Sequence, residues 1–224
     1  MTGRFGIIGC GYVGSAAAIH LRRQGREVVG TTTSPGRLVE LCDLVDHPRI
    51  YDAADPMADA SFLDHLDGVL IAVAPTTSNF EEDQYEKVYG QAVPALVDAL
   101  RQRPGGRPLH VSYLSSAGVY GDQSGAICNE LTPPDCSNSA NALLASAESS
   151  VLSLNDASTQ ACVLRLGGIY GPGKDIPSYI RSAAGQSVRK NGNHINAWVH
   201  LQDIIRGIDF AFGRRLQGVY NLVD

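Results

Sequence analysis

Three glycines near the start of the chain constrain its fold more than any other feature. They occupy positions 9, 11 and 14 in the stretch IIGCGYVGSAAAIHL, which is a G-x-G-x-x-G spacing. The apolar run RFGIIG before them is typical of a strand, and the run YVGSAAAIHLRRQG after them is typical of a helix that ends at Gly25. A second apolar run, EVVGTT, follows within about thirty residues. Glycines in this context indicate a binding site for the pyrophosphate of a dinucleotide.

Each glycine has its own part in this prediction. Gly9 permits the tight turn, Gly11 lets the backbone approach the pyrophosphate, and Gly14 lets the helix pack closely against the strand. Tyr12 and Val13, at the start of the helix, contribute free N–H groups and the positive end of the helix dipole. The alternative interpretation is a tight glycine turn without a ligand, and the strand before and helix after the motif favour the dinucleotide.

The end of the second predicted strand bears on which dinucleotide is bound. An acidic residue about 20 residues after the glycines would hold the ribose hydroxyls of NAD, and Thr32 stands at that position. The hydroxyls of Thr32, Thr33 and Ser34, together with Arg37, suit the 2′-phosphate of NADP instead. The sequence therefore favours NADP over NAD. The alternative for the same residues is a helix N-cap followed by a surface arginine.

The rest of the chain alternates between predicted strands and helices. Strands are expected at residues 68–75, 109–116 and 161–168. Helices are expected at residues 34–42, 79–103 and 139–154, the first with Ser34 as N-cap and the second bent near Pro94. This alternation predicts an α/β fold, a Rossmann-like doubly wound parallel sheet with helices on both faces.

We divide the chain into a dinucleotide-binding domain, residues 1–170, and a small substrate-side region, residues 171–224, that packs on it as one structural unit. The regular alternation stops after residue 170. Beyond it we expect a helix at residues 177–185, a second helix at residues 201–213 and a last strand at residues 218–223.

Composition argues against several other classes of protein. The net charge of −5 gives no electrostatic support for binding nucleic acid or an acidic membrane. The apolar runs of the chain have the length of strands and are too short to span a membrane, and no secretory signal is recognisable. The five cysteines are widely spaced without a CxxC pair, and the six histidines are scattered, so we expect neither disulfides nor a metal site. We expect a cytoplasmic protein.

Three later stretches, YLSSAGVYGD, LRLGGIYGPG and WVHLQDI, resemble the short-chain dehydrogenase/reductase superfamily. The likeness is to its extended and atypical branch, the NAD-dependent epimerase/dehydratase family, and it covers nearly the whole chain. The resemblance implies that Ser116 hydrogen-bonds the reacting carbonyl or hydroxyl of a substrate. It also implies a structural role for His200 and Asp203, which form the family's H-x-x-D pattern.

The same resemblance assigns further residues to the cofactor. Ala72, Val73 and Ala74, at the end of the strand expected at residues 68–75, would line its adenosine and ribose side, and Ser115 would lie beside it. The turn that follows the strand expected at residues 161–168 would lie next to the nicotinamide and contribute Gly168, Ile169 and Tyr170. Tyr170 is also a candidate catalytic residue.

The helix expected at residues 139–154 departs from the family pattern. The family uses a tyrosine and a lysine four residues apart, with the lysine lowering the pKa of the tyrosine so that it can act as acid or base. Counting back from Glu148, which fits the family's glutamate, places the lysine position at Leu144 and the tyrosine position at Ala140. The stretch SNSANALLASAESS contains no Tyr, Lys, His or Arg in any register.

Two functions remain open. The first is an NAD(P)-dependent, epimerase/dehydratase-like oxidoreductase with a rearranged catalytic group. Its candidate proton donors are Tyr120, Tyr170, Tyr179, His194 and His200. The second is a non-catalytic NADP-binding sensor or scaffold that acts through partners, which the empty positions on the helix favour.

The resemblance also bears on substrate and assembly. Family members acting on nucleotide sugars carry an arginine four residues before the histidine of H-x-x-D, and Asn196 stands there. We therefore expect a small-molecule substrate other than a nucleotide sugar, unless a basic residue of the set Lys174, Arg181, Arg189 and Lys190 replaces it. Tens of residues normally follow VYNLVD in the family, so we expect a truncated C-terminal lobe, and a homodimer is the candidate assembly.

Overall fold

The computed structural model describes residues 3–75, 81–104, 107–182, 184–185 and 197–224. Its centre is a seven-stranded sheet in the order β3-β2-β1-β4-β5-β6-β9, in which every neighbouring pair is parallel. The bounds of the strands are Arg4–Ile8 (β1), Glu27–Thr32 (β2), His47–Ile50 (β3), Gly68–Ile71 (β4), Leu109–Ser116 (β5), Thr159–Leu166 (β6) and Gly218–Leu222 (β9). The predicted doubly wound parallel sheet is confirmed.

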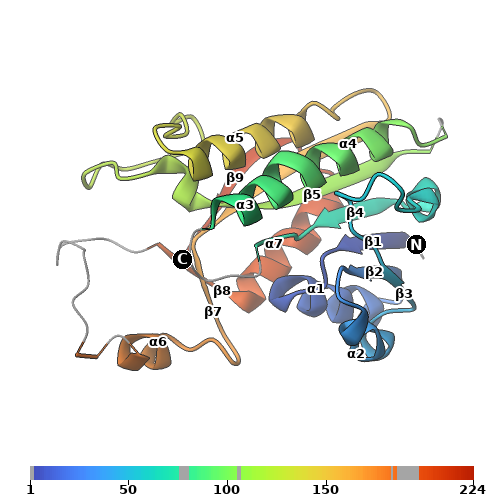
Figure 1. Cartoon of the computed structure of the whole chain (residues 1–224), viewed down its shortest axis with the longest axis horizontal. Coiled ribbons are helices and arrows are strands. Elements are labelled where there is room, and N and C mark those ends of the chain that lie inside the picture. Colours follow the sequence, from blue (N-terminus) through green and yellow to red (C-terminus); the bar gives the residue numbers. More distant parts are fainter. Residues whose placement is uncertain (1–2, 76–80, 105–106, 183, 186–196) are drawn as a thin grey trace.

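Helices cover both faces of the sheet (Figure 1). One face carries α1 (Tyr12–Arg23), α2 (Leu38–Leu44) and α7 (Leu201–Arg214), and the other carries α3 (Glu82–Tyr85), α4 (Val93–Arg101) and α5 (Ser139–Leu152). Each helical layer packs on its own apolar core, because side chains of a strand alternate between the two faces. Because neighbouring strands are all parallel, the loops at their carboxyl ends lie along one edge of the sheet. Parallel sheets bind ligands at this edge.

The helix predicted at residues 79–103 is not a single regular α-helix. A π-helical segment, Glu86–Ala92, separates α3 from α4. Pro94 follows directly, and it has no N–H to donate to a carbonyl in the preceding turn. The irregularity that the sequence predicted near Pro94 thus takes the form of a widened turn before the proline.

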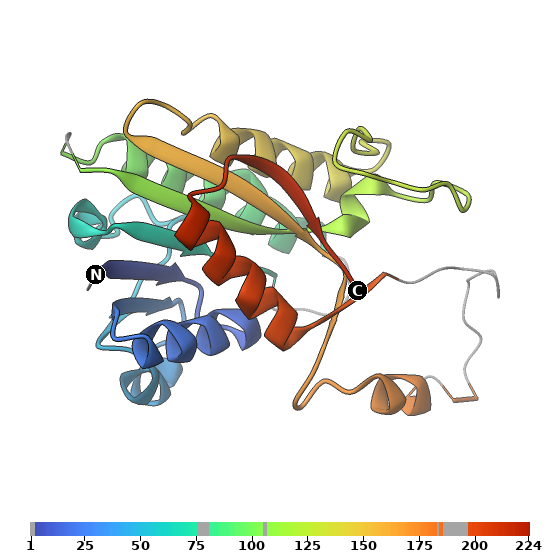
Figure 2. The ribbon, with the colours of Figure 1, turned by 180° about the vertical axis from the view of Figure 1, so that it is seen from behind.

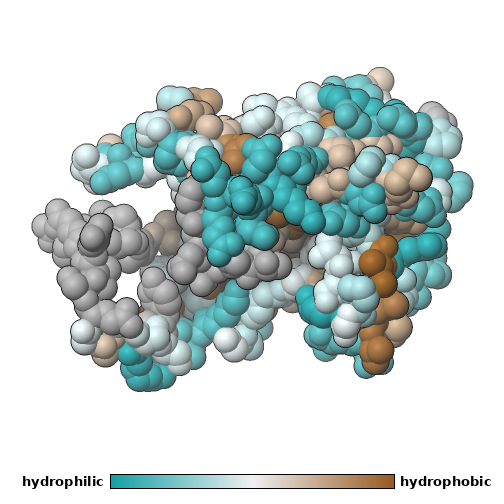
Figure 3. Space-filling view, viewed as in Figure 1, coloured by the Kyte–Doolittle hydropathy of each residue, from teal (hydrophilic) through white to brown (hydrophobic). Residues whose placement is uncertain are grey.

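The sheet contains one strand that the sequence analysis did not predict. This strand, β3, has the sequence HPRI and lacks the apolar run that identified the others. It lies at the edge of the sheet, where the missing N–H of Pro48 is tolerated. Apolar side chains gather over α2 and β3 in Figure 3, and Val39 and Ile50 are exposed there.

The chain after residue 170 contributes to two structures. Its last strand, β9, pairs with β6 and so completes the main sheet. A separate two-stranded sheet joins β7 (Gly168–Tyr170) to β8 (Trp198–His200), and α6 (Ile176–Ser182) lies apart from the two helical layers (Figure 2). The division at residue 170 stays a prediction, and the main sheet extends across it. Among the described residues, no helix is long and apolar enough to span a membrane.

Candidate dinucleotide-binding site

The three glycines of the loop between β1 and α1 differ in what the fold requires of them. Gly9 has a φ of +95°, and a Cβ there would lie 2.9 Å from the carbonyl oxygen of Ala72. A Cβ on Gly14 would collide with the carbonyl oxygen of Gly9. A Cβ on Gly11, by contrast, would meet no heavy atom of the described chain within 4 Å. Packing explains Gly9 and Gly14, whereas open space beside Gly11 fits the approach of a pyrophosphate to the backbone.

The neighbouring strand holds this loop in place. The N–H of Cys10 donates to the Thr31 carbonyl at 2.8 Å, and the N–H of Gly9 donates to the Thr31 hydroxyl at 3.0 Å. The first N–H groups of α1 have no partner within the helix, and Gly11 at the N-cap has no side chain to accept from them. The loop therefore presents free donors, at the start of α1 where Tyr12 and Val13 lie, to a bound anion.

The end of β2 places the residues predicted to distinguish NADP from NAD. The Thr32 hydroxyl is buried and accepts a hydrogen bond from the Ser34 N–H at 3.2 Å, while Thr33 and Ser34 are exposed. The Ser34 hydroxyl does not cap the following turn, although the sequence places it at that position. Arg37 Nε lies 3.3 Å from Glu40 Oε2. The predicted 2′-phosphate contacts stay predictions, and Arg37 already has an anionic neighbour.

The Cys10 thiol lies inside the glycine motif. Burial raises the pKa of Cys10 to about 11, and this outweighs the opposing hydrogen bond from Thr31 and the positive charge of Arg37. The thiol therefore stays protonated and unreactive at neutral pH.

Two further strands, β4 and β3, end at the same edge of the sheet as β1. The N–H of Ala72 donates to the Ile8 carbonyl at 2.9 Å, so the segment 72–74 begins directly beside the glycine turn. After β3, Asp52 Oδ2 accepts a hydrogen bond from Lys87 Nζ at 2.8 Å. Burial acts to raise the pKa of Asp52, but its hydrogen bonds and Lys87 lower it overall. No sequence pattern pointed to Asp52, because the strand before it, β3, has no apolar run.

Two consecutive serines end β5 and have different surroundings. Ser115 is buried and donates a hydrogen bond to Glu148 Oε1 at 2.6 Å, toward α5. Ser116 accepts a hydrogen bond from the Gly118 N–H at 3.1 Å, and the described residues offer no acceptor for its own O–H. The donation from Ser116 to a substrate oxygen stays a prediction, whereas the Ser115 hydroxyl already donates to Glu148 in the interior.

A buried ion pair joins α5 to the sheet behind these serines. Arg165 Nη2 lies 2.6 Å from Glu148 Oε2, and each side chain is 4% exposed. The guanidinium also stacks 4.8 Å from the centre of the Tyr120 ring, whose hydroxyl donates to Asn221 Oδ1 at 2.8 Å. The ion pair thus joins α5 to β6, and Tyr120 extends the connection to β9. In this arrangement Tyr120 is a packed aromatic side chain.

The helix α5 has structural residues where the family has its proton-transferring pair. Asn138 caps the helix by accepting from the Asn141 N–H at 2.9 Å. Leu144, at the lysine position, is 6% exposed and belongs to the apolar core with Ala147. Ala140, at the tyrosine position, is half-buried. The side chains of Ala140 and Leu144 cannot move a proton, so these two positions support the fold instead.

The turn after β7 lies against the start of α1. The Tyr12 hydroxyl donates to the Pro172 carbonyl at 2.8 Å, and Lys174 Nζ lies 4.7 Å from the centre of the Tyr12 ring. Gly168 is exposed and packs closely on the Trp198 ring, while Ile169 contacts the core under α7. The turn predicted to lie near the nicotinamide is thus brought to the glycine loop.

The remaining candidate proton donors have structural partners or lie outside the described residues. The Tyr170 hydroxyl donates to Asp224 Oδ2 at 2.9 Å, and this carboxylate raises the pKa of Tyr170, which is opposite to the direction the family's chemistry uses. His200 Nδ1 accepts from the Gln202 N–H and caps α7. The side chain of Tyr179 and the residues His194, Arg189, Lys190 and Asn196 lie outside the described part of the chain.

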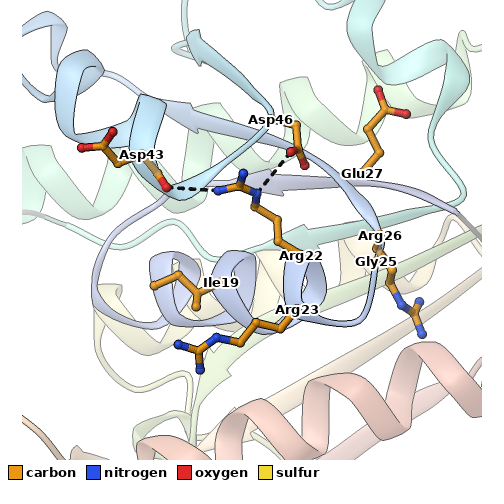
Figure 4. A pocket seen from close by; sticks show the side chains of 8 residues that line it. All are labelled: Ile19, Arg22, Arg23, Gly25, Arg26, Glu27, Asp43 and Asp46. Carbon is orange, nitrogen blue, oxygen red and sulfur yellow. Dashed lines mark hydrogen bonds and ion pairs between the residues drawn. The ribbon is translucent and has the colours of Figure 1, made fainter.

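A cavity of about 670 Å³ lies elsewhere, at the far end of α1 (Figure 4). Arg22 points into it and is bound by Asp46 Oδ1 at 3.2 Å and by the Asp43 carbonyl at 3.0 Å. Its basic and acidic side chains neutralise one another. Because it faces the amino ends of the strands, it is separate from the glycine loop.

Solved structures similar to this chain share its fold. A protein from Methylobacillus flagellatus, provisionally assigned as an NAD-dependent epimerase/dehydratase, is 26% identical, with a TM-score of 0.74 over 100% of this chain and 76% of that one. MoeE5, solved with UDP-glucose and NAD, is 21% identical, with a TM-score of 0.77 over 99% and 76%. The Bordetella bronchiseptica enzyme WbmG, solved with NAD, is 19% identical, with a TM-score of 0.76 over 100% and 73%.

A search of curated proteins gives no match. The sequence model of the NAD dependent epimerase/dehydratase family matches residues 7–222, nearly the whole chain. The chain therefore belongs to the NAD-dependent epimerase/dehydratase family.

Proposed function

We propose that the protein binds a nicotinamide dinucleotide at the carboxyl edge of its sheet and acts as an NAD(P)-dependent oxidoreductase. The observation that carries the proposal is the open space at Gly11, the one glycine of the loop for which the described chain gives no packing reason. The bound cofactor would supply or accept a hydride. The glycine loop would hold its pyrophosphate, and Ser116 would orient a substrate carbonyl or hydroxyl.

We propose NADP rather than NAD as the cofactor. Thr32 stands where an acid would hold the ribose of NAD, and Arg37 carries a positive charge that suits a 2′-phosphate. MoeE5 and WbmG were solved with NAD, so this chain would differ from those two proteins in its cofactor.

We propose a small hydroxyl or carbonyl compound as substrate. MoeE5 was solved with UDP-glucose, but Asn196 removes from this chain the arginine that would clamp a nucleotide diphosphate. Arg181, one candidate replacement, lies 3.8 Å from Asp175, and Lys174 lies against Tyr12.

A specific observation favours a second function, a non-catalytic NADP-binding sensor or scaffold. The lysine position of α5 is filled by Leu144, which is a core residue and not an exposed replacement. A positioned acid or base contributes about 10²–10⁴ in rate. A protein that only binds the cofactor would need neither the tyrosine–lysine pair nor a substitute proton donor.

Calorimetric titration of the purified chain with NADPH and NADH, followed by incubation of the NADPH complex with a panel of carbonyl compounds, tests both functions. Binding with loss of the reduced nicotinamide absorbance supports the oxidoreductase, and Ser116→Ala should then lower turnover while leaving binding nearly unchanged. Binding without turnover of any compound supports the sensor or scaffold. Absence of binding contradicts both.

A further inference from the structure

The arginine that suits a 2′-phosphate is already engaged by an anion of its own chain. Arg37 Nε lies 3.3 Å from Glu40 Oε2, and Arg37 Nη2 lies 3.5 Å from Glu40 Oε1. Both carboxylate oxygens therefore face one side of the guanidinium, in the two-point arrangement that a phosphate would also adopt. A carboxylate and a phosphate would compete for the same donors.

The position of this pair is fixed at the edge of the site. The Arg37 N–H donates to the Ser34 carbonyl at 3.1 Å, and the Ser34 N–H donates to the Thr32 hydroxyl, so a tight turn connects the end of β2 to α2. Glu40 lies three residues after Arg37, on the first turn of α2. Its negative charge is consequently adjacent to any group that Arg37 binds.

The pair is also weak enough for a ligand to compete with it. The side chains of Arg37 and Glu40 are 43% and 61% exposed. Ion pairs this open to water contribute about 0–1 kcal/mol, so the contact restrains Arg37 without locking it. The effect of Glu40 would therefore appear as a modest change in affinity and not as all-or-none binding.

We propose that Glu40 sets the preference of this site between NADP and NAD, by occupying Arg37 and by repelling a 2′-phosphate. The inference rests on the proposed function. A phosphate monoester carries a charge of about −1.5 to −2 at neutral pH, so a nearby carboxylate opposes it more strongly than it opposes the neutral ribose hydroxyl of NAD. Glu40 thus weakens NADP binding selectively.

The test is a set of calorimetric titrations with NADPH and NADH on the wild-type chain and on Glu40→Gln. We expect the variant to bind NADPH about three- to tenfold more tightly and NADH within about twofold of wild type. The NADPH gain should shrink between about 0.05 M and about 0.5 M salt, because ions screen exposed charges. In an Arg37→Ala background the same substitution should give a smaller gain, since only the repulsion is then removed.

Asp98→Asn is the matched control. Asp98 forms an exposed pair with Arg101 at the same three-residue spacing, 3.1 Å apart, but on α4 and away from β2. We expect Asp98→Asn to leave the affinities for NADPH and for NADH unchanged. Equal changes for NADPH and NADH in Glu40→Gln, or no change for NADPH, would overturn the inference while leaving the proposed function intact. A wild-type chain that binds neither nucleotide would remove the proposed function, and the inference with it.

Discussion

The glycine loop and helix α5 differ in what they keep of the family pattern. The loop has Gly9 and Gly14 where backbone packing requires glycine, and Gly11 where a ligand would approach. In α5, Leu144 and Ala140 stand at the positions predicted for the family's lysine and tyrosine. The fold alone therefore does not decide whether this chain only binds a cofactor or also performs chemistry.

Helix α5 is also part of the apolar core. Leu144 and Ala147 pack into the apolar layer under α4, and Glu148 forms the buried pair with Arg165. These contacts need a helix at this place whatever chemistry it carries. The comparison therefore predicts that substitutions in α5 affect stability most, whereas substitutions in the loop can separate binding from stability.

Breaking the buried ion pair should have the largest effect. Glu148→Ala leaves the Arg165 charge buried without a partner and removes the acceptor of Ser115, so we expect a loss of about 3–5 kcal/mol in the free energy of unfolding. Urea denaturation measures it. The double variant Glu148→Leu with Arg165→Met should recover most of the loss, because no uncompensated charge remains. A single-variant loss below about 1 kcal/mol would contradict the structural role of the pair.

Restoring the family's lysine should be costly as well. Leu144→Lys places an ammonium group in the apolar core, and we expect a loss of about 3 kcal/mol in unfolding free energy at neutral pH. Burial would depress the folded-state pKa of the lysine below its unfolded value, so the loss should diminish as pH rises toward about 10. Ser146→Lys, on the exposed side of α5, is the control. Equal losses for the two variants would show that Leu144 is not a core residue.

Placing a charge at Gly11 should abolish binding but not folding. Gly11→Asp puts a carboxylate into the open space at the start of α1, where a pyrophosphate would lie, so we expect at least about a hundredfold weaker NADPH binding, or about 2.7 kcal/mol. Gly213→Asp, an exposed position on α7 with no neighbour within 4 Å of an added Cβ, is the control. Unchanged affinity in Gly11→Asp would contradict the assignment of the loop.

Gly14→Ala sharpens the same comparison within the loop. Because its Cβ would collide with the Gly9 carbonyl oxygen, we expect this variant to lose unfolding free energy, whereas Gly11→Ala should stay within about 1 kcal/mol of wild type. Thermal or urea denaturation of the two variants side by side measures the difference. Similar stabilities would mean that packing does not distinguish the two glycines.

The smallest expected effect belongs to Arg37. Arg37→Ala removes one charge-assisted contact to a 2′-phosphate but none to the rest of the dinucleotide, so we expect NADPH binding to weaken about tenfold and NADH binding to change by less than about twofold. Competitive titration of the two cofactors measures the ratio. Equal losses would show that Arg37 does not distinguish them.

Much of this structure was predictable because the sequence signals are local. The strand, glycine turn and helix at the start, and the alternation after them, follow from spacing and periodicity over a few residues. The short edge strand His47–Ile50 escaped prediction because its sequence has no such period. The predicted site residues, the homodimer and the cytoplasmic location stay predictions, as do the substrate and the truncation of the C-terminal lobe.

The sequence by itself determined the glycine turn between strand and helix, the parallel α/β sheet and the absence of Tyr, Lys, His and Arg from residues 137–150, since each is written in consecutive residues. Only the tertiary structure decided which partners meet across the chain. It paired Glu148 with Arg165, added β9 to the sheet beside β6, and gave Gly11 open space where Gly14 has none. These outcomes depend on side chains and backbone atoms brought together from distant segments, and no local pattern records how such segments pack.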